Sequence, residues 1–465
     1  MSVNSFSSLN LDPALIKNLA TLGYESMTPV QAETLPAMLA GEDIIAQSRT
    51  GSGKTVAFGL GLLHNLAVKR FRIQSLVLCP TRELADQVAR EIRKLARSIH
   101  NIKVLTLCGG VPLGPQIGSL EHGAHIIVGT PGRIEDHLNK GTLNLDNVNT
   151  LVLDEADRML EMGFKLALDL IFSLCPAQRQ TLLFSATFPD QIQSITDQIM
   201  KNPVMVKITT PQTDSDITQH FFRIEHETQR QSALQKILLE FSPESTVVFC
   251  NTRLETQALA DDLNQQGFDC LPLHGDLEQR DRDQTLVKFA NKSTSILIAT
   301  DVAARGLDID KLDLVVHYRL SRDPEVHIHR TGRTGRAGNK GIACTLLSEN
   351  EYYKIEKLED YLKQSIKTEP LPPYTSKRRF PKPTMVTLLI DGGKKQKIRP
   401  GDIVGALTSK AGIAGNEVGK IHVFDHHAYV AIQRDKAKIA LQTIAKGKLK
   451  GRNFRVRLIH ENSRR

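Results

Sequence analysis

Short apolar runs rich in β-branched residues alternate with longer stretches of helical periodicity through most of the chain. One series of runs comprises Asp43–Ala46, Ser75–Leu78, Lys103–Leu107, His125–Val128, Leu151–Leu153 and Thr181–Phe184. A second series comprises Thr246–Phe249, Ser295–Ala299, Leu314–His317 and Ile342–Leu346. Uniformly apolar strands separated by helices are typical of parallel sheets that are buried on both faces. The pattern therefore predicts two tandem α/β domains.

The polar stretch Thr209–Thr218 separates the two series and has the composition of a linker. We therefore assign residues 1–208 to the first domain and 209–368 to the second, which closes with a charged, helical segment over Glu351–Lys367.

The pattern changes after residue 368. Residues 369–383 contain five prolines and a basic cluster, which predicts a stiff, extended linker. Residues 384–465 then show an alternation of strand and helix patterns in the order βαββαβ, which is the arrangement of an RNA-recognition-motif (RRM) domain. The expected elements are Val386–Ile390, Pro400–Ala411, Val418–Phe424, Ala428–Gln433, Lys436–Lys446 and Asn453–Leu458.

Positive charge is concentrated in this last part of the chain. Residues 371–465 hold 21 Lys and Arg against 6 Asp and Glu, a net charge of +15, while the remaining 39 basic and 45 acidic residues give residues 1–370 a net charge of −6. A basic segment of this density predicts contact with a phosphate backbone; a merely solvated surface would intersperse the two signs.

Cysteine spacing and hydropathy exclude other classes. The six cysteines contain no C-x-x-C pair, so we expect small buried core residues rather than a zinc site or disulfides. The chain shows no signal-peptide pattern and no run of eighteen apolar residues, which predicts a cytoplasmic protein without membrane contact. We also expect a monomer, since no heptad run is evident.

A glycine-rich segment, SRTGSGKT at residues 48–55, lies between a short strand and an apolar helix. Backbone amides of such a loop cradle phosphates, a lysine (Lys54) reaches the terminal phosphates, and a hydroxyl (Thr55) coordinates Mg²⁺. The usual pattern begins with Gly, and Ser48 stands in that place. The loop therefore predicts a site for phosphates and Mg²⁺.

Two carboxylates follow an apolar strand about one hundred residues later. Asp154 is placed to hold the Mg²⁺ shell at the carboxyl edge of the sheet, and Glu155 to orient and deprotonate the attacking water. In the second domain, HRTGRTGR at residues 329–336 supplies arginines at three-residue spacing, which predicts arginine fingers for the γ-phosphate.

Together these segments closely resemble the DEAD-box RNA helicase family. The resemblance extends over residues 5–360 through GYESMTPVQ (23–31), SRTGSGKT, PTRELA (80–85), GG (109–110), TPGR (130–133), DEAD (154–157), SAT (185–187), ARGLD (304–308) and HRTGRTGR. It implies two RecA-like domains that close on ATP and RNA, with local rather than processive unwinding.

The resemblance also implies roles for individual residues. Gln31 would read the adenine edge, Phe6 would stack on the base and Asp308 would bind the ribose, while Arg333 and Arg336 would reach ATP from the second domain. Ser185 and Thr187 would couple nucleotide state to strand separation. The remaining ATP-binding positions are Ser48, Arg49, Thr50, Gly51, Ser52, Gly53, Lys54 and Thr55. The implied RNA contacts are Thr81, Arg82, Gly110, Thr130, Arg133, Asn251, Arg253, Gly275, Gln279, Arg282 and Thr300.

The domain order and the segments DGGKKQKIRPGDIVGAL and AYVAI are similar to the bacterial DbpA family, whose members act on 23S ribosomal RNA during assembly of the large (50S) subunit. By this resemblance the C-terminal RNA contacts would include Lys394, Lys395, Lys397, Lys420, Arg452, Arg455 and Arg457. Tyr429 is a candidate either for stacking on a base or for the domain core, because its strand lacks the usual pair of aromatic residues.

We therefore predict RNA-stimulated ATP hydrolysis with local remodelling of 23S rRNA in precursors of the 50S subunit. Two alternatives stay open: a general RNA helicase without rRNA preference, and an ATP-gated RNA clamp or scaffold.

Overall fold

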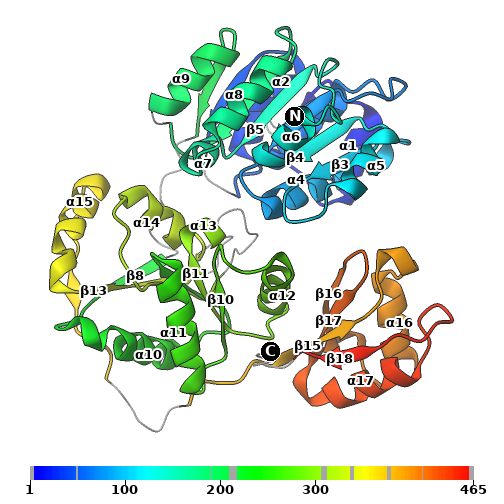
Figure 1. Cartoon of the computed structure of the whole chain (residues 1–465). Helices are drawn as coiled ribbons and strands as arrows, with labels where there is room; N and C mark the ends of the chain where they lie inside the picture. The colour runs from blue at the N-terminus through cyan, green and yellow to red at the C-terminus, as the bar shows by residue number, and fades with distance from the viewer. Residues whose placement is uncertain are drawn as a thin grey trace. The chain divides into compact units, whose positions relative to one another are not determined.

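The computed structural model describes residues 5–48, 51–188, 190–208, 217–304, 312–335, 340–373, 379–410 and 412–459. It forms two compact units, one of which holds the chain up to Gln212 and the other nearly all of the remainder (Figure 1).

The first unit is a seven-stranded sheet in the order β3-β4-β2-β5-β6-β1-β7, and all of its strand pairs are parallel. Its strands are β1 (Ile44–Gln47), β2 (Ser75–Leu78), β3 (Val104–Leu107), β4 (Ile126–Gly129), β5 (Thr150–Asp154), β6 (Gln180–Ser185) and β7 (Val204–Lys207). Its helices are α1 (Pro13–Thr21), α2 (Pro29–Leu39), α3 (Lys54–His64), α4 (Arg82–Leu95), α5 (Gly114–Glu121), α6 (Pro131–Asn139), α7 (Ala156–Glu161), α8 (Lys165–Leu174) and α9 (Asp190–Ile199).

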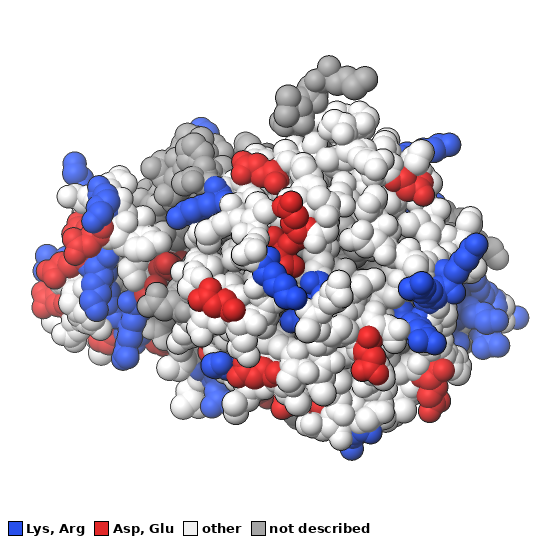
Figure 2. All heavy atoms as spheres, turned by 90° about the horizontal axis from the view of Figure 1, so that it is seen from above, with Lys and Arg blue, Asp and Glu red and all other residues white. Residues whose placement is uncertain are grey.

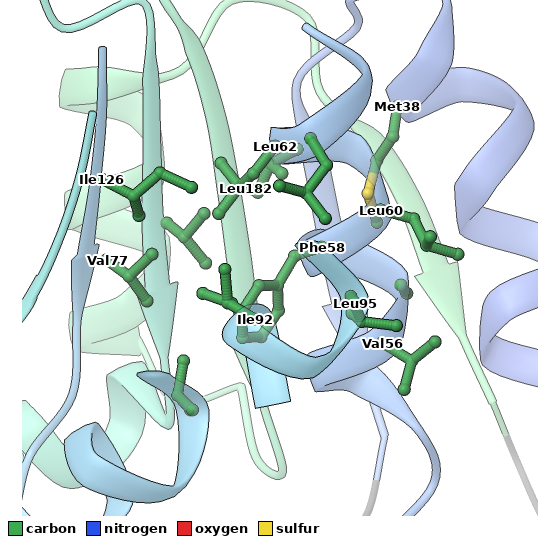
Figure 3. Packing of buried hydrophobic residues seen from close by; sticks show 14 of the residues in the cluster. Met38, Val56, Phe58, Leu60, Leu62, Val77, Ile92, Leu95, Ile126 and Leu182 are labelled. Carbon is green, nitrogen blue, oxygen red and sulfur yellow. The ribbon is translucent and has the colours of Figure 1, made fainter. Parts of the chain in front are cut away.

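Each face of this sheet has its own hydrophobic core. Successive side chains of a strand point to opposite faces, so Val152 packs with α1 to α4, whereas its neighbours Leu151 and Leu153 pack with α6 to α9. On the first face, Phe58 packs in one cluster with Ile92 and Leu182 (Figure 3). The ring centroids of Phe58 and Phe184 are 5.3 Å apart. The continuous apolar runs of the sequence are explained by this burial from both sides.

The second unit contains a similar sheet in the order β10-β11-β9-β12-β13-β8-β14, again with parallel pairs throughout. Its strands are β8 (Ile217–Arg223), β9 (Thr246–Cys250), β10 (Cys270–Leu273), β11 (Ile296–Thr300), β12 (Leu314–His317), β13 (Gly341–Leu347) and β14 (Thr368–Glu369). Its helices are α10 (Arg230–Phe241), α11 (Arg253–Gln265), α12 (Gln279–Ala290), α13 (Asp301–Ala304), α14 (Pro324–Thr331) and α15 (Tyr352–Leu362).

The prediction of two parallel α/β domains is confirmed, but strands β7, β8, β10 and β14 were not predicted. The linker prediction was wrong at its end, because Ile217 and Thr218 begin β8. This strand mixes polar and apolar residues and is only partly buried, so it lacks the continuous apolar run used to find the others. Strand β10 lies at a sheet edge and contains Pro272, which weakens its pattern further.

Residues 385–458 form the predicted βαββαβ domain around an antiparallel sheet in the order β16-β17-β15-β18. Its elements are β15 (Met385–Ile390), α16 (Pro400–Lys410), β16 (Val418–Val423), β17 (Ala428–Gln433), α17 (Ala437–Lys446) and β18 (Val456–Leu458). Both helices pack on one face of this sheet, where Leu388, Ile390 and Val430 lie in the core.

The opposite face of this small sheet packs against α12 of the second unit. Leu389 and Tyr429, which are neighbours on β15 and β17, contact Val287. The Thr387 hydroxyl accepts a hydrogen bond from Asn291 Nδ2 at 3.1 Å and lies 2.6 Å from the hydroxyl of Ser293. The sheet surface that an RRM usually offers to RNA is therefore covered by a helix of the same chain.

Within the described ranges, no helix is long and apolar enough to cross a membrane. All six cysteines are buried and unpaired, as expected, and burial raises the pKa of each thiol.

Candidate nucleotide and RNA sites

The glycine-rich segment forms the turn between β1 and α3, at the carboxyl edge of the first sheet. Gly51 and Gly53 have φ angles of 80° and 96°, a region that L side chains rarely adopt. Lys54 is buried and donates from Nζ to the Ser48 carbonyl at 3.0 Å, and the hydroxyls of Ser48 and Ser52 lie 3.1 Å apart. Thr55 occupies the first turn of α3. Arg49 and Thr50 lie outside the described residues.

The Gln31 side chain forms a hydrogen bond that stabilises this loop. Its Oε1 accepts from the Thr28 amide at 2.9 Å, and its Nε2 donates to the Gly53 carbonyl at 3.0 Å. A Cβ on Gly53 would lie 2.5 Å from Gln31 Nε2 and would have a strained φ of 96°, so a larger residue would displace the Gln31 side chain. Phe6, in the short 3-10 helix η1 (Phe6–Ser8), is 3% exposed and packs in the first core. Adenine contacts for Gln31 and Phe6 stay predictions.

Asp154 and Glu155 lie at the end of β5, next to strands β2 and β6 in the sheet. Burial raises the pKa of Asp154 to about 7, although the Lys54 cation opposes this, and Asp154 Oδ1 is buried without a hydrogen-bond partner. Glu155 has a φ of 55°, an uncommon conformation for a side chain with Cβ. An unsatisfied carboxylate oxygen is a ligand that fits Mg²⁺, and the Lys54 cation close to it is suited to the phosphates that such a metal accompanies.

The SAT segment connects the phosphate loop to the DEAD segment. The Ser185 carbonyl accepts from the Ser48 amide at 3.0 Å, and Thr187 donates to Asp157 from both its amide and its hydroxyl. The Ser185 hydroxyl is buried without a partner. The two residues predicted to couple nucleotide state to RNA therefore bond to both halves of the nucleotide site.

The predicted RNA contacts of the first unit follow the ends of β2, β3 and β4. Thr81 and Thr130 are the N-caps of α4 and α6, and Gly110 follows β3 with a φ of 76°. Arg82 begins α4 and lies 3.8 Å from Asp86. The sheet order thus separates this group, at β3-β4-β2, from the nucleotide group at β5-β6-β1.

Arg133 is held by residues that the sequence did not single out. Its guanidinium donates to Gln116 Oε1 at 2.8 Å and to the Val111 carbonyl at 3.0 Å, and it pairs with Asp136 at 3.2 Å. The same Gln116 oxygen lies 3.0 Å from His137 Nε2. No motif marks Gln116, so only the fold brings it to this site.

In the second unit, Arg330 is the centre of a buried network. It is 2% exposed, pairs with both oxygens of Asp301, donates to Asn251 Oδ1 at 3.1 Å and lies over the Phe249 ring. This first arginine of HRTGRTGR is therefore a structural residue. Arg333, one turn later, is partly exposed. Arg336 and Asp308 lie outside the described residues.

The other predicted RNA contacts of this unit lie at the carboxyl ends of β9, β10 and β11. Arg253 begins α11 and pairs with Asp276, and Gly275 follows β10. Gln279 and Arg282 lie in the first turn of α12, where they bond to Asp283 and to the Ala303 carbonyl. Thr300 ends β11. These residues come together at one edge of the sheet, as in the first unit.

In the C-terminal domain, most of the predicted basic contacts gather at one end of the sheet. Lys394, Lys395 and Lys397 follow β15, and Arg452 and Arg455 precede β18, whose first residue pairs with the last of β15. All five are exposed. Arg457 pairs with Asp391 at 3.3 Å, and Lys420 lies on β16, the opposite edge strand.

Tyr429 is 1% exposed because it packs between its own sheet and α12. Its ring is not available to a base in this arrangement. The sequence left two interpretations of Tyr429 open, stacking on a base or packing in the domain core. This placement agrees with packing in the core.

Figure 2 shows acidic and basic side chains interspersed on the face that it presents. The formal charges of the sequence agree with this view. Residues 1–370 contain nearly equal numbers of acidic and basic residues, and the excess of lysine and arginine lies in residues 371–465.

Comparison with known proteins supports the same division of the chain. Residues 28–195 match the DEAD/DEAH box helicase family, 229–338 the helicase conserved C-terminal domain and 387–458 the DbpA RNA binding domain. The chain is 52% identical to the ATP-dependent RNA helicase DbpA of Escherichia coli K12, over 98% of this chain and all of that protein. It is 42% identical to the DEAD-box ATP-dependent RNA helicase CshA of Geobacillus kaustophilus, over 78% of each.

Among solved structures, S. cerevisiae Dbp5 bound to RNA and ADP BeF3 is similar, with 30% identity, coverage of 79% of this chain and 96% of that one, and a TM-score of 0.72. The family matches cover the nucleotide site, the second helicase domain and the basic C-terminal domain in turn. The chain therefore belongs to the DEAD-box ATP-dependent RNA helicases, in the group that carries a DbpA RNA-binding domain.

Proposed function

We propose that this helicase hydrolyses Mg²⁺-bound ATP to open short duplexes of 23S rRNA during assembly of the large ribosomal subunit. The observation that carries the nucleotide part is the Ser48–Ser185 and Thr187–Asp157 connection, which ties the phosphate loop to the carboxylates. The DbpA RNA-binding domain and its excess of basic residues carry the rRNA part.

Lys54 leaves the Ser48 carbonyl to bind the terminal phosphates, while Thr55 and Asp154 would hold Mg²⁺. The metal, when bound, neutralises charge that develops on the phosphates. Glu155 orients the attacking water and accepts its proton. Its strained backbone agrees with a side chain that is fixed for one task.

Arg333 and Arg336 stabilise the γ-phosphate during its transfer, acting from the second domain. ATP and RNA each contact both domains, so each ligand favours the same closed state and strengthens binding of the other. The closed state holds one RNA strand in a bent path that a regular duplex does not follow, and the complementary strand leaves. Loss of the γ-phosphate then reopens the domains.

The exposed lysines and arginines beside β15 and β18 bind the phosphate backbone of the rRNA target. Because α12 covers the face of the small sheet that carries Leu389 and Tyr429, this domain recognises RNA through its loops and sheet edges. Binding at these sites decreases steeply with salt concentration.

Strand displacement by Glu155→Gln tests the catalytic assignment. We expect this variant to bind ATP and RNA like the wild type and to hydrolyse ATP at least about 100-fold more slowly, since general bases contribute about 10²–10⁴-fold. An unchanged rate of hydrolysis would refute the role of Glu155. A pure ATP-gated clamp would keep its cellular function in this variant, whereas a remodelling enzyme would lose it.

The rRNA target is tested in the full-length protein with Lys394→Glu and Lys395→Glu combined. We expect ATP hydrolysis stimulated by generic RNA to persist and the preference for 23S rRNA to be lost. Equal stimulation of the wild type by 23S rRNA and by unrelated RNA of the same length would favour a general helicase. Crosslinking in cells with sequencing of the bound RNA identifies the site directly.

A further inference from the structure

The first turn of α12 and the loop between β16 and β17 meet at the margin of the interface between the second helicase domain and the C-terminal domain. Arg280, Asp283, Val287 and Asn291 follow one another at spacings of three and four residues and so share a face of α12. Val287 and Asn291 contact the small sheet directly. Arg280 lies on the same face, but beyond the covered part, and is exposed.

The β16–β17 loop reaches α12 through Tyr429, which contacts Val287 and the rings of Phe424 and His427, and Arg280 lies about two turns before Val287 on the same face of α12. Burial lowers the pKa of His427, and the charge of Arg280 lowers it further. Burial raises the pKa of Tyr429 to about 12, and the Arg280 cation opposes this rise. Across the described part of the chain, no carboxylate pairs with the Arg280 guanidinium. Arg280 therefore offers an unpaired cation beside this loop.

The loop presents two stacked rings beside this cation. The rings of Phe424 and His427 have centroids 4.9 Å apart and planes 14° apart. The buried Tyr429 ring meets both of them edge-on, at 5.7 and 5.2 Å. Phe424 and His427 remain partly exposed. A stacked aromatic pair that is partly exposed can serve as a platform for an unstacked base.

The lysine turn after β15 is fixed to this same loop. The amides of Lys394 and Lys395 donate to the carbonyls of Phe424 and Asp425 at 2.8 and 2.9 Å. A Cβ on Gly393 would lie 2.2 Å from the Phe424 carbonyl oxygen, so the two segments are in close contact. The backbone thus holds the aromatic pair and the lysines in one fixed arrangement.

Among the described residues, none of the acidic side chains in this region forms an ion pair with Arg280, Lys394 or Lys395. Asp283 accepts a hydrogen bond from Gln279 at 2.8 Å, and Asp391 pairs with Arg457. Asp281 and Asp425 are exposed to solvent, as the three cations are, so screening weakens the charges of both signs alike. Arg280, Lys394 and Lys395 remain as exposed cations next to the aromatic pair.

We propose that this junction binds an unpaired RNA segment, with one base stacked on the Phe424–His427 pair and its phosphate on Arg280. The inference rests on the proposed function, which it deepens. The segment connects the strand bound near Gln279 and Arg282 to the RNA held by the lysine turn. Duplex RNA does not fit this role, because its bases are already stacked inside the helix.

Equilibrium binding of the full-length protein to a 23S rRNA transcript over a range of salt concentrations tests the proposal. Arg280→Ala should weaken binding about tenfold and lower the slope of log K against log salt by about one, as expected for one lost phosphate contact. Phe424→Ala should weaken binding about fivefold or more without changing the slope, since stacking is not ionic. Phe424→Leu keeps the apolar contact with Tyr429 and should show the same loss.

Matched controls are Arg223→Ala and Tyr353→Ala, which remove an exposed arginine and an exposed aromatic ring elsewhere in the second unit. These controls should bind as the wild type does. In addition, 4-thiouridine in the transcript should crosslink to peptides containing residues 424–427. Wild-type affinity and salt slope in Arg280→Ala and Phe424→Leu would overturn this inference while leaving the proposed function intact. A wild-type protein whose ATP hydrolysis does not respond to RNA would instead overturn the proposed function.

Discussion

Thr187 donates two hydrogen bonds to Asp157 Oδ2, from its amide at 3.1 Å and from its hydroxyl at 2.9 Å. The two residues are 30 positions apart, and the contact joins the segment after β6 to α7, which begins directly after Glu155. We therefore expect a movement of Asp154 or Glu155 on hydrolysis to reach the SAT segment through Asp157, the last carboxylate of the DEAD segment.

Replacement of Thr187 by valine removes the hydroxyl donor and preserves the shape of the side chain. We expect strand displacement to fall about fivefold or more, because the contact contributes about 1–1.5 kcal/mol. ATP hydrolysis should fall less, since Lys54 and Glu155 are untouched. Comparing both rates in one preparation measures the coupling. Thr187→Ser retains a hydroxyl and should behave as the wild type; an equal loss in serine and valine variants would contradict this account.

Gly53→Ala should weaken ATP binding about fivefold or more, because the added Cβ would lie 2.5 Å from Gln31 Nε2, would displace that side chain and would require a φ of 96°. Gly41→Ala is the matched control. Its φ is 85°, but nothing lies within 4 Å of an added Cβ. Isothermal titration with a nonhydrolysable ATP analogue measures the ATP affinity of both variants, and so separates the clash with Gln31 from the backbone strain that the two variants share. Because both positions have a positive φ, backbone strain by itself should cost the two variants the same stability. The control Gly41→Ala should nevertheless bind ATP with normal affinity.

The second helicase domain should lose stability in mild acid. His317 and His327 are stacked with ring centroids 4.2 Å apart, and burial lowers the pKa of His327 to about 3 and that of His317 well below its ordinary value. Histidines that stay neutral when folded but take up protons when unfolded favour unfolding as pH falls below about 6.5. Each such group lowers the free energy of unfolding by about 1.4 kcal/mol per pH unit below about pH 6, and for His327 this loss continues to about pH 3.

His327→Phe keeps a ring in the stack and should roughly halve this acid dependence. Scanning calorimetry between pH 7.5 and 5 measures it as the slope of transition temperature against pH. The exposed His122→Asn is the control and should leave the slope unchanged. A variant slope equal to that of the wild type would show that protonation of His327 does not drive the loss.

Thr387→Val should loosen the C-terminal domain from α12. The hydroxyl bonds to Asn291 and Ser293, and its loss leaves the Asn291 amide buried without this acceptor, at a cost of about 1–3 kcal/mol. Hydrogen exchange of peptides from α12 should become faster by a factor of about five or more. Thr443→Val, whose hydroxyl bonds within α17, should not change exchange in α12. Unaltered exchange in Thr387→Val would show that this contact does not hold the domain in place.

Much of this molecule could be predicted from local sequence. Strands buried on both faces leave continuous apolar runs in the sequence. A glycine-rich turn before a helix, or a carboxylate after a strand, can be recognised from a few consecutive residues. For this reason β2 and β12 have the predicted bounds, and the elements of the C-terminal domain were found in their correct order. Strands at or near a sheet edge, such as β8 and β10, lack that signal because one side of them is less buried.

The tertiary structure decided which side chains are free to act. Arg330 and Arg333 look equivalent in the sequence, but a network of Asp301, Asn251 and Phe249 buries only the former. Tyr429 has the pattern of a stacking residue or of a core residue, and α12, more than 130 positions earlier in the chain, determines that it is buried. Hydrophobic periodicity is set by neighbours along the chain, whereas burial and pairing depend on segments that only folding brings together.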